Sequence, residues 1–172
     1  METPEVLNEA QLGRMLAELR SESGPGGNTR AFNEALIAEF RRTGGKISGE
    51  LGGPQYRFLL LTTTGAKSGK PRTVPLGYVK VDGRLFILAS KGGGATNPLW
   101  FGNVVAHPEV VVEIGSETYR ARADVKEGAE RERLFAAIVE KAPRFREYQE
   151  RTPRPIPVVE LIRLDDVEPR TG

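Results

Sequence analysis

The sequence predicts a mainly β protein with flanking helices, of the α+β class, whose strands form a closed or split antiparallel barrel. Three observations favour this fold. The chain has 172 residues and 38% apolar content, which suits one globular domain that buries roughly 70% of its extended surface. Six segments between turn signals have the composition of strands. Helical patterns do not alternate with these strands, which argues against a doubly wound sheet.

Two helices are expected before the first strand. Residues 3–20 combine a capping pattern with apolar residues at helical spacing, which predicts an amphipathic helix that packs on protein. Residues 21–27 predict a flexible linker. The second helix is expected over residues 31–42 and ends at the pair Gly44 and Gly45. Its apolar face consists of Phe32, Leu36 and Phe40.

The middle and carboxyl-terminal parts of the chain predict the barrel. The expected strands cover residues 56–64, 73–81, 84–90, 110–114, 117–123 and 158–164. Asp82 and Gly83 form the tight hairpin turn between the second strand and the third. A Gly-rich loop over residues 91–97 precedes a short helix that ends near His107, and a longer helix is expected over residues 129–142.

The most informative segment is residues 59–72, LLLTTTGAKSGKPR, in which an apolar strand runs into a loop crowded with Gly and cations. Lys67, Lys70 and Arg72 can meet phosphate or carboxylate, and the hydroxyl of Ser68 adds a further donor. The glycines of the loop let backbone N–H groups turn toward one point. We interpret the loop as an anion site. The alternative is a solvated hairpin tip, because Gly, Ser and Lys are ordinary turn residues.

The distribution of charge favours a defined anionic ligand. Residues 56–91 contain seven cations and one anion, whereas the whole chain has a net charge of only +2. A nucleic-acid-binding protein needs a broader basic face, so no nucleic-acid partner is expected. A P-loop is excluded because Lys70 stands where its second Gly belongs. A dinucleotide fingerprint that starts at Gly92 fails because Asn97 occupies its last Gly position.

The absence of several residue patterns narrows the function further. The chain has no Cys and a single His, His107, so neither a disulfide framework nor a zinc centre is expected, and no metal site is predicted. The amino terminus lacks the pattern of a signal peptide, and no apolar run approaches about 18 residues. We therefore expect a cytoplasmic location.

Four motifs occur in the order and at the spacing of one known family. They are residues 59–72, 89–93 (ASKGG), 97–103 (NPLWFGN) and 151–159 (RTPRPIPVV). With these motifs the chain resembles the deazaflavin (F420)-dependent nitroreductase family of actinobacteria. The resemblance implies a split antiparallel β-barrel of the FMN-binding type. It also implies that the protein binds the deazaflavin coenzyme F420 and transfers hydride from its reduced form to an electrophilic acceptor.

The resemblance extends from about residue 28 to residue 164. We therefore expect residues 1–27 to form a helix and linker, and residues 28–172 to form the deazaflavin-binding domain. The residues implied to lie near the phosphate and oligoglutamate tail of the coenzyme are Lys67, Ser68, Lys70 and Arg72. The further contacts implied with the coenzyme are Pro75, Ser90, Lys91, Gly92, Asn97, Pro98, Leu99, Trp100 and Asn103.

The expected catalytic residues are Ser90 and Tyr148. The Ser90 hydroxyl can donate a hydrogen bond to a quinone carbonyl or nitro oxygen, and Tyr148 can orient the acceptor or donate a proton. Two structural alternatives stay open: Trp100 as a core residue, and Ser90 as a strand-end hydroxyl bonded to the backbone. No protein nucleophile is needed, because the protein mainly holds donor and acceptor in position.

The acceptor pocket departs from the family pattern. Members that reduce nitroimidazoles have tyrosines in the segment that matches residues 142–148, where this chain keeps Tyr148 but has Ala142 and Phe145. A pocket with fewer hydroxyls favours a quinone acceptor over a nitroimidazole.

Two other functions stay open. The barrel could bind FMN as an ordinary flavin oxidoreductase, or it could be a non-catalytic carrier of an anionic cofactor or lipid-like molecule. The expected partner is a small-molecule electron acceptor, a quinone or nitroaromatic. Peripheral association with the inner face of the cell membrane is a further expectation, and the sequence leaves the oligomeric state open.

Overall fold

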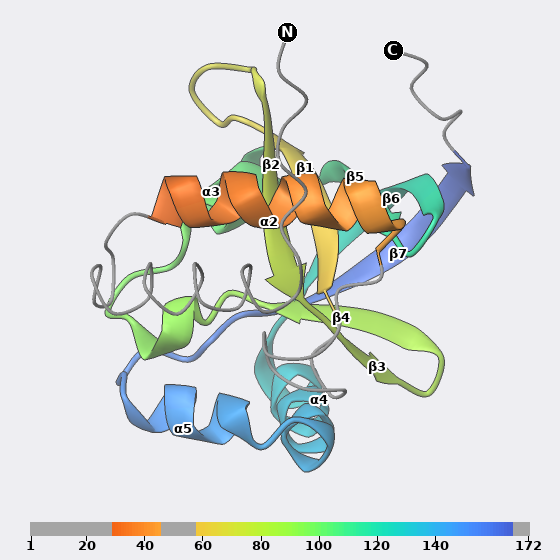
Figure 1. Cartoon of the computed structure of the whole chain (residues 1–172). Coiled ribbons are helices and arrows are strands. Elements are labelled where there is room, and N and C mark those ends of the chain that lie inside the picture. The colour runs from red at the N-terminus through yellow and green to blue at the C-terminus, as the bar shows by residue number, and fades with distance from the viewer. Residues whose placement is uncertain (1–28, 46–57, 167–172) are drawn as a thin grey trace, which may run out of the picture. The chain divides into compact units, whose positions relative to one another are not determined.

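The computed structural model describes residues 29–45 and 58–166 (Figure 1). The chain divides into two units, residues 1–56 and 57–172, which are described separately. The predicted helix and linker over residues 1–27 and the first two residues of the predicted first strand lie outside the described residues.

The first unit contains helix α2, Thr29–Thr43, which confirms the second predicted helix. Leu36 and Phe40, two members of its predicted apolar face, are buried. The helix ends as expected at Gly44 and Gly45, whose φ angles are 64° and 82°. The Gly45 N–H donates a hydrogen bond to the Phe40 carbonyl at 2.8 Å, which satisfies one of the carbonyls left over at a helix end.

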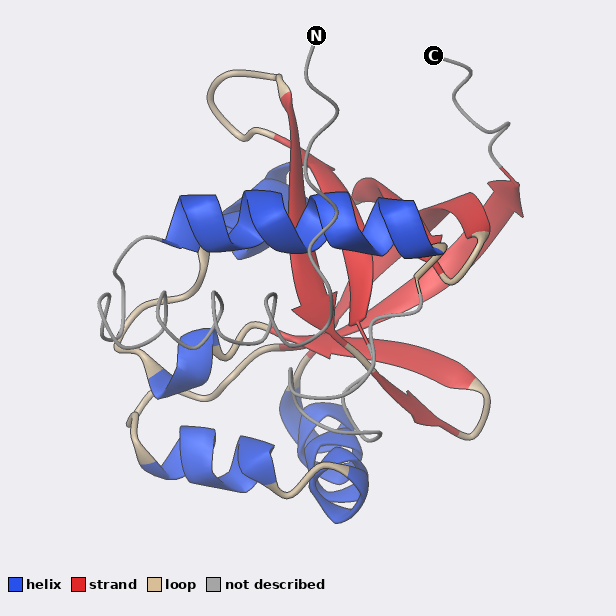
Figure 2. Ribbon diagram, viewed as in Figure 1, coloured by secondary structure: helices blue, strands red, loops and turns tan. Residues whose placement is uncertain are grey.

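The second unit is built on a seven-stranded antiparallel sheet (Figure 2). Its strands are β1 (Phe58–Thr64), β2 (Pro71–Gly77), β3 (Val79–Val81), β4 (Arg84–Leu88), β5 (Glu109–Ile114), β6 (Glu117–Lys126) and β7 (Val158–Asp166). Their order across the sheet is β2-β1-β5-β6-β7-β4-β3. β2 and β3 therefore lie at opposite edges although only Tyr78 separates them in sequence. Because consecutive Cα atoms are about 3.8 Å apart, the sheet has to curl until its edges approach each other, as in a split barrel.

The prediction of one strand over residues 73–81 was wrong. The chain changes partner at Tyr78, since β2 pairs with β1 and β3 pairs with β4. The alternation of side chains continues through this corner, so the period of the sequence does not reveal it. Pro75 faces Leu60 across the β1–β2 pair, and it is tolerated because β2 is an edge strand. The barrel class is confirmed, with seven strands in place of six.

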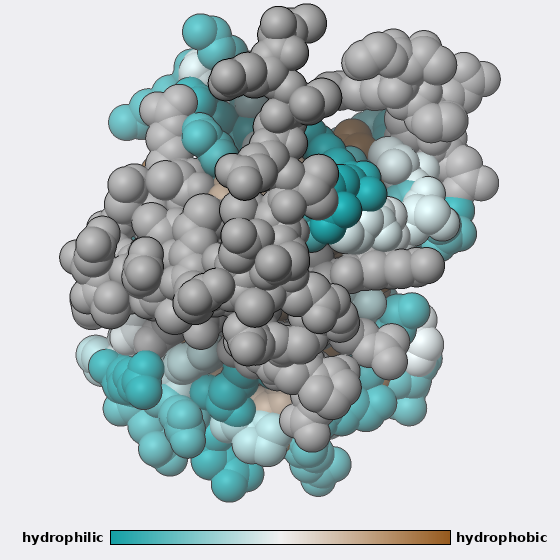
Figure 3. Space-filling view, in the orientation of Figure 1, coloured by the Kyte–Doolittle hydropathy of each residue, from teal (hydrophilic) through white to brown (hydrophobic). Residues whose placement is uncertain are grey.

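Four helical segments accompany the sheet: η1 (Lys91–Gly93), α3 (Leu99–Ala106), α4 (Gly128–Lys141) and α5 (Arg144–Glu150). α3 and α4 confirm predictions, and His107 ends α3 as expected. The sequence did not predict α5, because seven residues give too short a window for helical periodicity. In Figure 3 the described surface over α4 and α5 is mostly hydrophilic, in agreement with the exposed residues of both helices.

The sheet separates two hydrophobic cores. Successive residues of β4 point to opposite faces, so Leu85 and Ile87 pack in the barrel core, whereas Phe86 and Leu88 pack against α4 and α5. β7 alternates in the same way, and its Glu160 faces the helix side. A strand that is buried on both faces has a nearly continuous apolar sequence, as residues 85–88 of β4 do.

A partly buried ion network lies on the helix side of the sheet. Lys126 at the end of β6 contacts Asp124 at 2.7 Å and Glu160 at 3.1 Å, and Glu160 also binds Arg84 at 2.8 Å. Only 8% of the Lys126 side chain is exposed. The acidic and basic run over residues 126–133 has the pattern of a solvated helix face, yet Lys126 and Arg131 within it are both largely buried. Composition alone does not show that each has carbonyl or carboxylate partners inside the protein.

Candidate functional site

The basic loop joins β1 to β2 and projects at the top of Figure 1. Its backbone closes on itself: Gly65 N–H donates to the Lys70 carbonyl at 2.8 Å, and Gly69 N–H donates to the Gly65 carbonyl at 2.9 Å. The Ser68 hydroxyl accepts a hydrogen bond from the Lys70 N–H at 3.2 Å. A Cβ at position 65 would lie 2.5 Å from this hydroxyl oxygen, so the loop closes this tightly only with Gly there.

The cations of the loop are exposed and unpaired. Lys67, Lys70 and Arg72 form no ion pair with any residue that the structure describes. Other cations of the basic segment have different surroundings, since Arg84 is held by Glu160. Among the described residues 58–91, three of the five cations without an ion pair therefore lie in or next to this loop, and the other two are Lys80 and Lys91. Three unpaired cations beside a folded loop suit an anionic ligand.

Asn103 on α3 fixes the loop to the barrel. Its side-chain oxygen accepts a hydrogen bond from the Ala66 N–H at 3.0 Å, and its side-chain nitrogen donates to the buried Thr63 hydroxyl at 3.0 Å. Both ends of the amide are used within the protein. The structure therefore gives Asn103 a role in holding the loop, and its expected contact with the coenzyme ring stays a prediction.

The second candidate segment, residues 89–97, follows β4 and contains η1. Ser90 precedes η1, and its hydroxyl makes no capping bond there and no hydrogen bond to any other described residue. The alternative of a hydroxyl bonded to the backbone is therefore not observed. Lys91 has a φ angle of 48°, an uncommon backbone conformation for a residue with a side chain. Its ammonium lies 3.4 Å from the Thr96 hydroxyl.

Arg154 holds this segment from the other end of the chain. Its guanidinium donates to the carbonyls of Ala89 at 3.2 Å, Ser90 at 3.0 Å and Gly94 at 2.9 Å. It also donates to the side-chain oxygen of Asn97 at 2.7 Å. Burial lowers the pKa of Arg154 from its ordinary value, although an arginine remains protonated at any physiological pH. The expected site residues Ser90 and Asn97 thus meet at one guanidinium.

Helix α5 packs directly on η1. Gly93 has a φ angle of 86°, and a Cβ there would lie 2.8 Å from both the Tyr148 carbonyl oxygen and the Arg151 Cβ. The structure therefore brings together the two segments that carry the expected catalytic residues Ser90 and Tyr148. The Tyr148 ring is half-buried and meets the Phe145 ring edge to face, with 5.8 Å between centroids.

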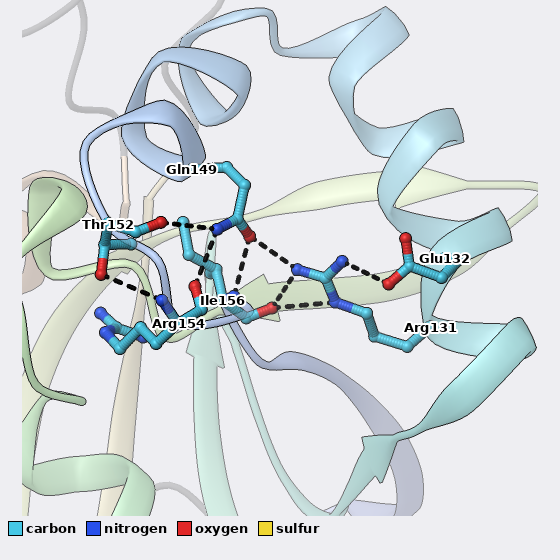
Figure 4. Close-up of polar contacts among 6 residues, drawn as sticks. All are labelled: Arg131, Glu132, Gln149, Thr152, Arg154 and Ile156. Atoms are coloured by element: carbon cyan, nitrogen blue, oxygen red, sulfur yellow. Dashed lines mark hydrogen bonds and ion pairs between the residues drawn. The ribbon is translucent and has the colours of Figure 1, made fainter.

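A hydrogen-bonded chain behind α5 supports Arg154 (Figure 4). Arg131 donates to the Ile156 carbonyl at 2.8 Å and to the Gln149 side-chain oxygen at 2.9 Å. The side-chain nitrogen of Gln149 donates to the Arg154 carbonyl at 2.8 Å, and its oxygen accepts from the Ile156 N–H at 2.9 Å. Arg131, Gln149 and Arg154 were not among the site residues predicted from the sequence. The one available signal was an arginine among prolines in residues 151–157, because proline lacks the backbone N–H donor that a regular ladder needs.

Helix α3 connects the two candidate segments. It begins two residues after Asn97, and its Asn103 binds the basic loop. Trp100 is 6% exposed and belongs to the barrel core, which fits the structural alternative for that residue, whereas Leu99 is 91% exposed. Pro98 and Pro75 are half-exposed. Helix α3 thus lies between the two candidate segments, with residues 89–97 before its first turn and the basic loop bound at Asn103.

Comparisons with known proteins identify a matching family and several similar proteins. A family model described as F420H(2)-dependent quinone reductase matches residues 34–162. An F420H(2)-dependent quinone reductase of Mycobacterium tuberculosis is 39% identical over 129 residues, which are 73% of this chain and 86% of the relative. The solved structure of an F420-H2 dependent reductase, FDR-A, is 45% identical with a TM-score of 0.55, and the match covers 60% of this chain and 92% of that chain. A further structure, described as a domain-swapped dimer, is 38% identical with a TM-score of 0.57 and covers 73% and 94%.

Proposed function

We propose that this chain, which belongs to the F420H(2)-dependent quinone reductase family, transfers hydride from reduced coenzyme F420 to a quinone. Membership makes the protein an oxidoreductase with coenzyme F420 as its cofactor. It confirms the deazaflavin dependence that the motifs implied, and the family description names quinones as the acceptors. The observation that carries the proposal is the basic loop within the matched residues 34–162, whose cations form no ion pair in the described part of the chain.

The donor set of the chain fits an elongated anionic coenzyme. Lys67, Lys70 and Arg72 are exposed cations for the phosphate and glutamate carboxylates of the tail, and charge-assisted hydrogen bonds of this kind are about twice as strong as neutral ones. The segment with Ser90 and Lys91 would hold the ring. The other residues proposed to bind the coenzyme are Ser68, Pro75, Gly92, Asn97, Pro98, Leu99, Trp100 and Asn103.

Hydride transfer depends on the orientation of the donor and the acceptor more than on reactive side chains. The bound reduced coenzyme supplies the hydride, and good orientation of donor and acceptor can contribute up to about 7–11 kcal/mol. The Ser90 hydroxyl, which has no hydrogen bond to another described residue, can donate to the acceptor oxygen on which negative charge develops. Tyr148, held beside η1 by α5, can orient the acceptor or give up a proton.

The acceptor preference rests on the family rather than on the two substituted tyrosine positions. Ala142 and Phe145 are buried in the core beneath α4 and α5. The side chains at both positions lie inside this core. The absence of a tyrosine hydroxyl there therefore has no evident effect on an exposed pocket wall. Quinone reduction is supported by the description of the family, and nitroaromatic reduction is a secondary expectation.

We also propose that the protein meets its acceptor at a membrane surface rich in anionic lipid. Leu99 and Val105 on α3 are 91% and 62% exposed, and the same helix binds the cationic loop through Asn103. Exposed apolar side chains beside cations favour the interface of an anionic bilayer. Within the described residues, no helix is long and apolar enough to cross a bilayer. Co-sedimentation with anionic and neutral vesicles tests this proposal, and Val105→Ser should reduce binding to the anionic vesicles.

Two measurements test the proposed reaction. Fluorescence titration should show tighter binding of coenzyme F420 than of FMN. Steady-state oxidation of the reduced coenzyme should be faster with a menaquinone analogue than with a bicyclic nitroimidazole. Preference for FMN, or tight coenzyme binding without turnover of either acceptor, would overturn the proposal in favour of a flavin enzyme or a carrier.

A further inference from the structure

Arg154 is the main tertiary support of residues 89–97 within the described part of the chain. Inside the segment, only Gly93 N–H to the Ser90 carbonyl and Gly94 N–H to the Lys91 carbonyl are backbone hydrogen bonds. From outside, Ala89 N–H bonds to the Pro157 carbonyl, and Arg154 adds four donor contacts to four different residues of the segment. These four contacts span 57 to 65 residues of sequence.

The Arg154 contacts fix geometry rather than neutralise charge. All four acceptors are uncharged oxygens, and among the described residues no carboxylate pairs with this guanidinium. A guanidinium presents its N–H groups in a planar fork, whereas a lysine ammonium is a single point of charge on a flexible stem. One arginine can therefore hold three carbonyls and an amide oxygen at once, and a lysine cannot.

Arg154 is itself held in place. Its carbonyl accepts from the Gln149 amide, and its N–H lies 3.4 Å from the Thr152 hydroxyl (Figure 4). Gln149 is in turn bound by the buried Arg131. A support whose own backbone is fixed by separate hydrogen bonds can determine the position of residues 89–97.

We propose that Arg154 is a positioning residue for the coenzyme: by fixing the carbonyls of Ala89, Ser90 and Gly94 it holds Ser90 and Lys91 in the arrangement that binds the deazaflavin ring. This inference rests on the proposed function. Arg154 acts through the segment and need not touch the coenzyme. Removal of the guanidinium leaves three carbonyls without their donor, and the segment then samples other conformations.

The test compares Arg154→Gln, Arg154→Lys and Arg154→Ala with the wild-type protein by two independent measurements. The first is hydrogen–deuterium exchange of the coenzyme-free proteins. Exchange should accelerate in peptides that cover residues 89–97 and stay unchanged in β5 and β6. The second is fluorescence titration, in which affinity for coenzyme F420 should fall by at least about tenfold in each variant, the range for loss of donors to partly buried acceptors.

Chemical rescue separates positioning from general loss of structure. Millimolar guanidinium should restore a large part of the coenzyme affinity of Arg154→Ala and slow its exchange over residues 89–97, whereas urea should not. Arg84→Gln is the matched control, because it removes a guanidinium from the network around Glu160 and should leave coenzyme affinity unchanged. If Arg154→Ala does not fold, Arg154→Lys carries the same comparison.

Three results would overturn the inference. Unchanged exchange over residues 89–97 would show that Arg154 does not hold the segment. Faster exchange with wild-type affinity would show that the held conformation does not matter for the coenzyme. Wild-type affinity in Arg154→Lys would show that charge suffices without the fork. Failure of the wild-type protein to bind the coenzyme would instead remove the proposed function, and with it the role of Arg154.

Discussion

The β1–β2 loop and residues 89–97 carry the two halves of the candidate site, but they are stabilised in different ways. The loop closes through hydrogen bonds within residues 65–70, and among the described residues Asn103 adds a hydrogen bond to it from outside. Residues 89–97 depend on Arg154 and on the close packing of Gly93 against α5. The basic loop should therefore keep its conformation when residues elsewhere in the chain are substituted. Residues 89–97 are held by a side chain more than fifty residues away, so a substitution there should change their conformation.

The largest effect is expected from Gly93→Ala, compared with Gly69→Ala in the basic loop. Both positions have positive φ angles, but a Cβ at position 93 meets backbone and Arg151 at 2.8 Å, whereas a Cβ at position 69 meets nothing within 4 Å. Gly93→Ala should lower the free energy of unfolding by about 2–5 kcal/mol through strain and overpacking. Gly69→Ala should cost about 1–2 kcal/mol through its φ angle alone. Denaturant titration measures both, and equal losses would contradict the distinction.

Loss of a loop cation should affect coenzyme binding without affecting stability. Lys67→Ala and Arg72→Ala should each weaken binding of coenzyme F420 by about 1.5–3 kcal/mol, the range for hydrogen bonds to charged groups. Added salt should weaken wild-type binding too, because the loop is exposed. Lys80→Ala, at an exposed position of β3, is the control. If a tail-free deazaflavin bound the wild-type protein equally well, the loop would not be the tail site.

Tyr148→Phe tests whether the packing of α5 on η1 serves the reaction. The substitution keeps the ring that contacts Phe145 and removes only the hydroxyl. We expect kcat/KM for a quinone to fall by about tenfold, equivalent to about 1.4 kcal/mol, with little change in coenzyme affinity. Steady-state kinetics with a menaquinone analogue measures this, and an unchanged rate would remove Tyr148 from the mechanism.

The smallest effect is expected from the ion network, which lies outside both site segments. Hydrogen bonds from Arg84, and in smaller measure from Lys126, lower the pKa of Glu160 below its ordinary value of 4.5, although burial alone would raise it. A carboxylate with a lowered pKa stabilises the folded protein above its ordinary pKa, and this contribution is lost as pH falls through the folded-state value. Glu160→Gln should therefore be less stable than wild type near neutral pH, and the difference should shrink below about pH 4.5. A difference that is constant with pH would contradict the assignment, and coenzyme affinity should not change.

Much of the fold could be predicted because its signals are local. Helix α2 has an apolar face and a Gly pair at its end, and the turns at Asp82 and Gly115 mark their hairpins. The corner at Tyr78 was missed because a change of strand partner leaves the alternation of side chains intact. Helix α5 was missed because its seven residues form a helix through contacts with η1 and α4 rather than through a pattern of their own.

The sequence by itself determined the barrel class, and the motifs that it shares with the family implied the dependence on a deazaflavin. The cations and glycines of residues 65–72 also predicted an anion site, because charge and backbone freedom belong to the residues themselves. Only the tertiary structure decided that Asn103 anchors the loop, that Trp100 packs in the barrel core and that Arg154 holds Ser90. The sequence does not distinguish an arginine on a solvated face from an arginine beneath a binding segment. Its role depends on which carbonyls lie within about 3 Å, and the folded chain alone brings them there.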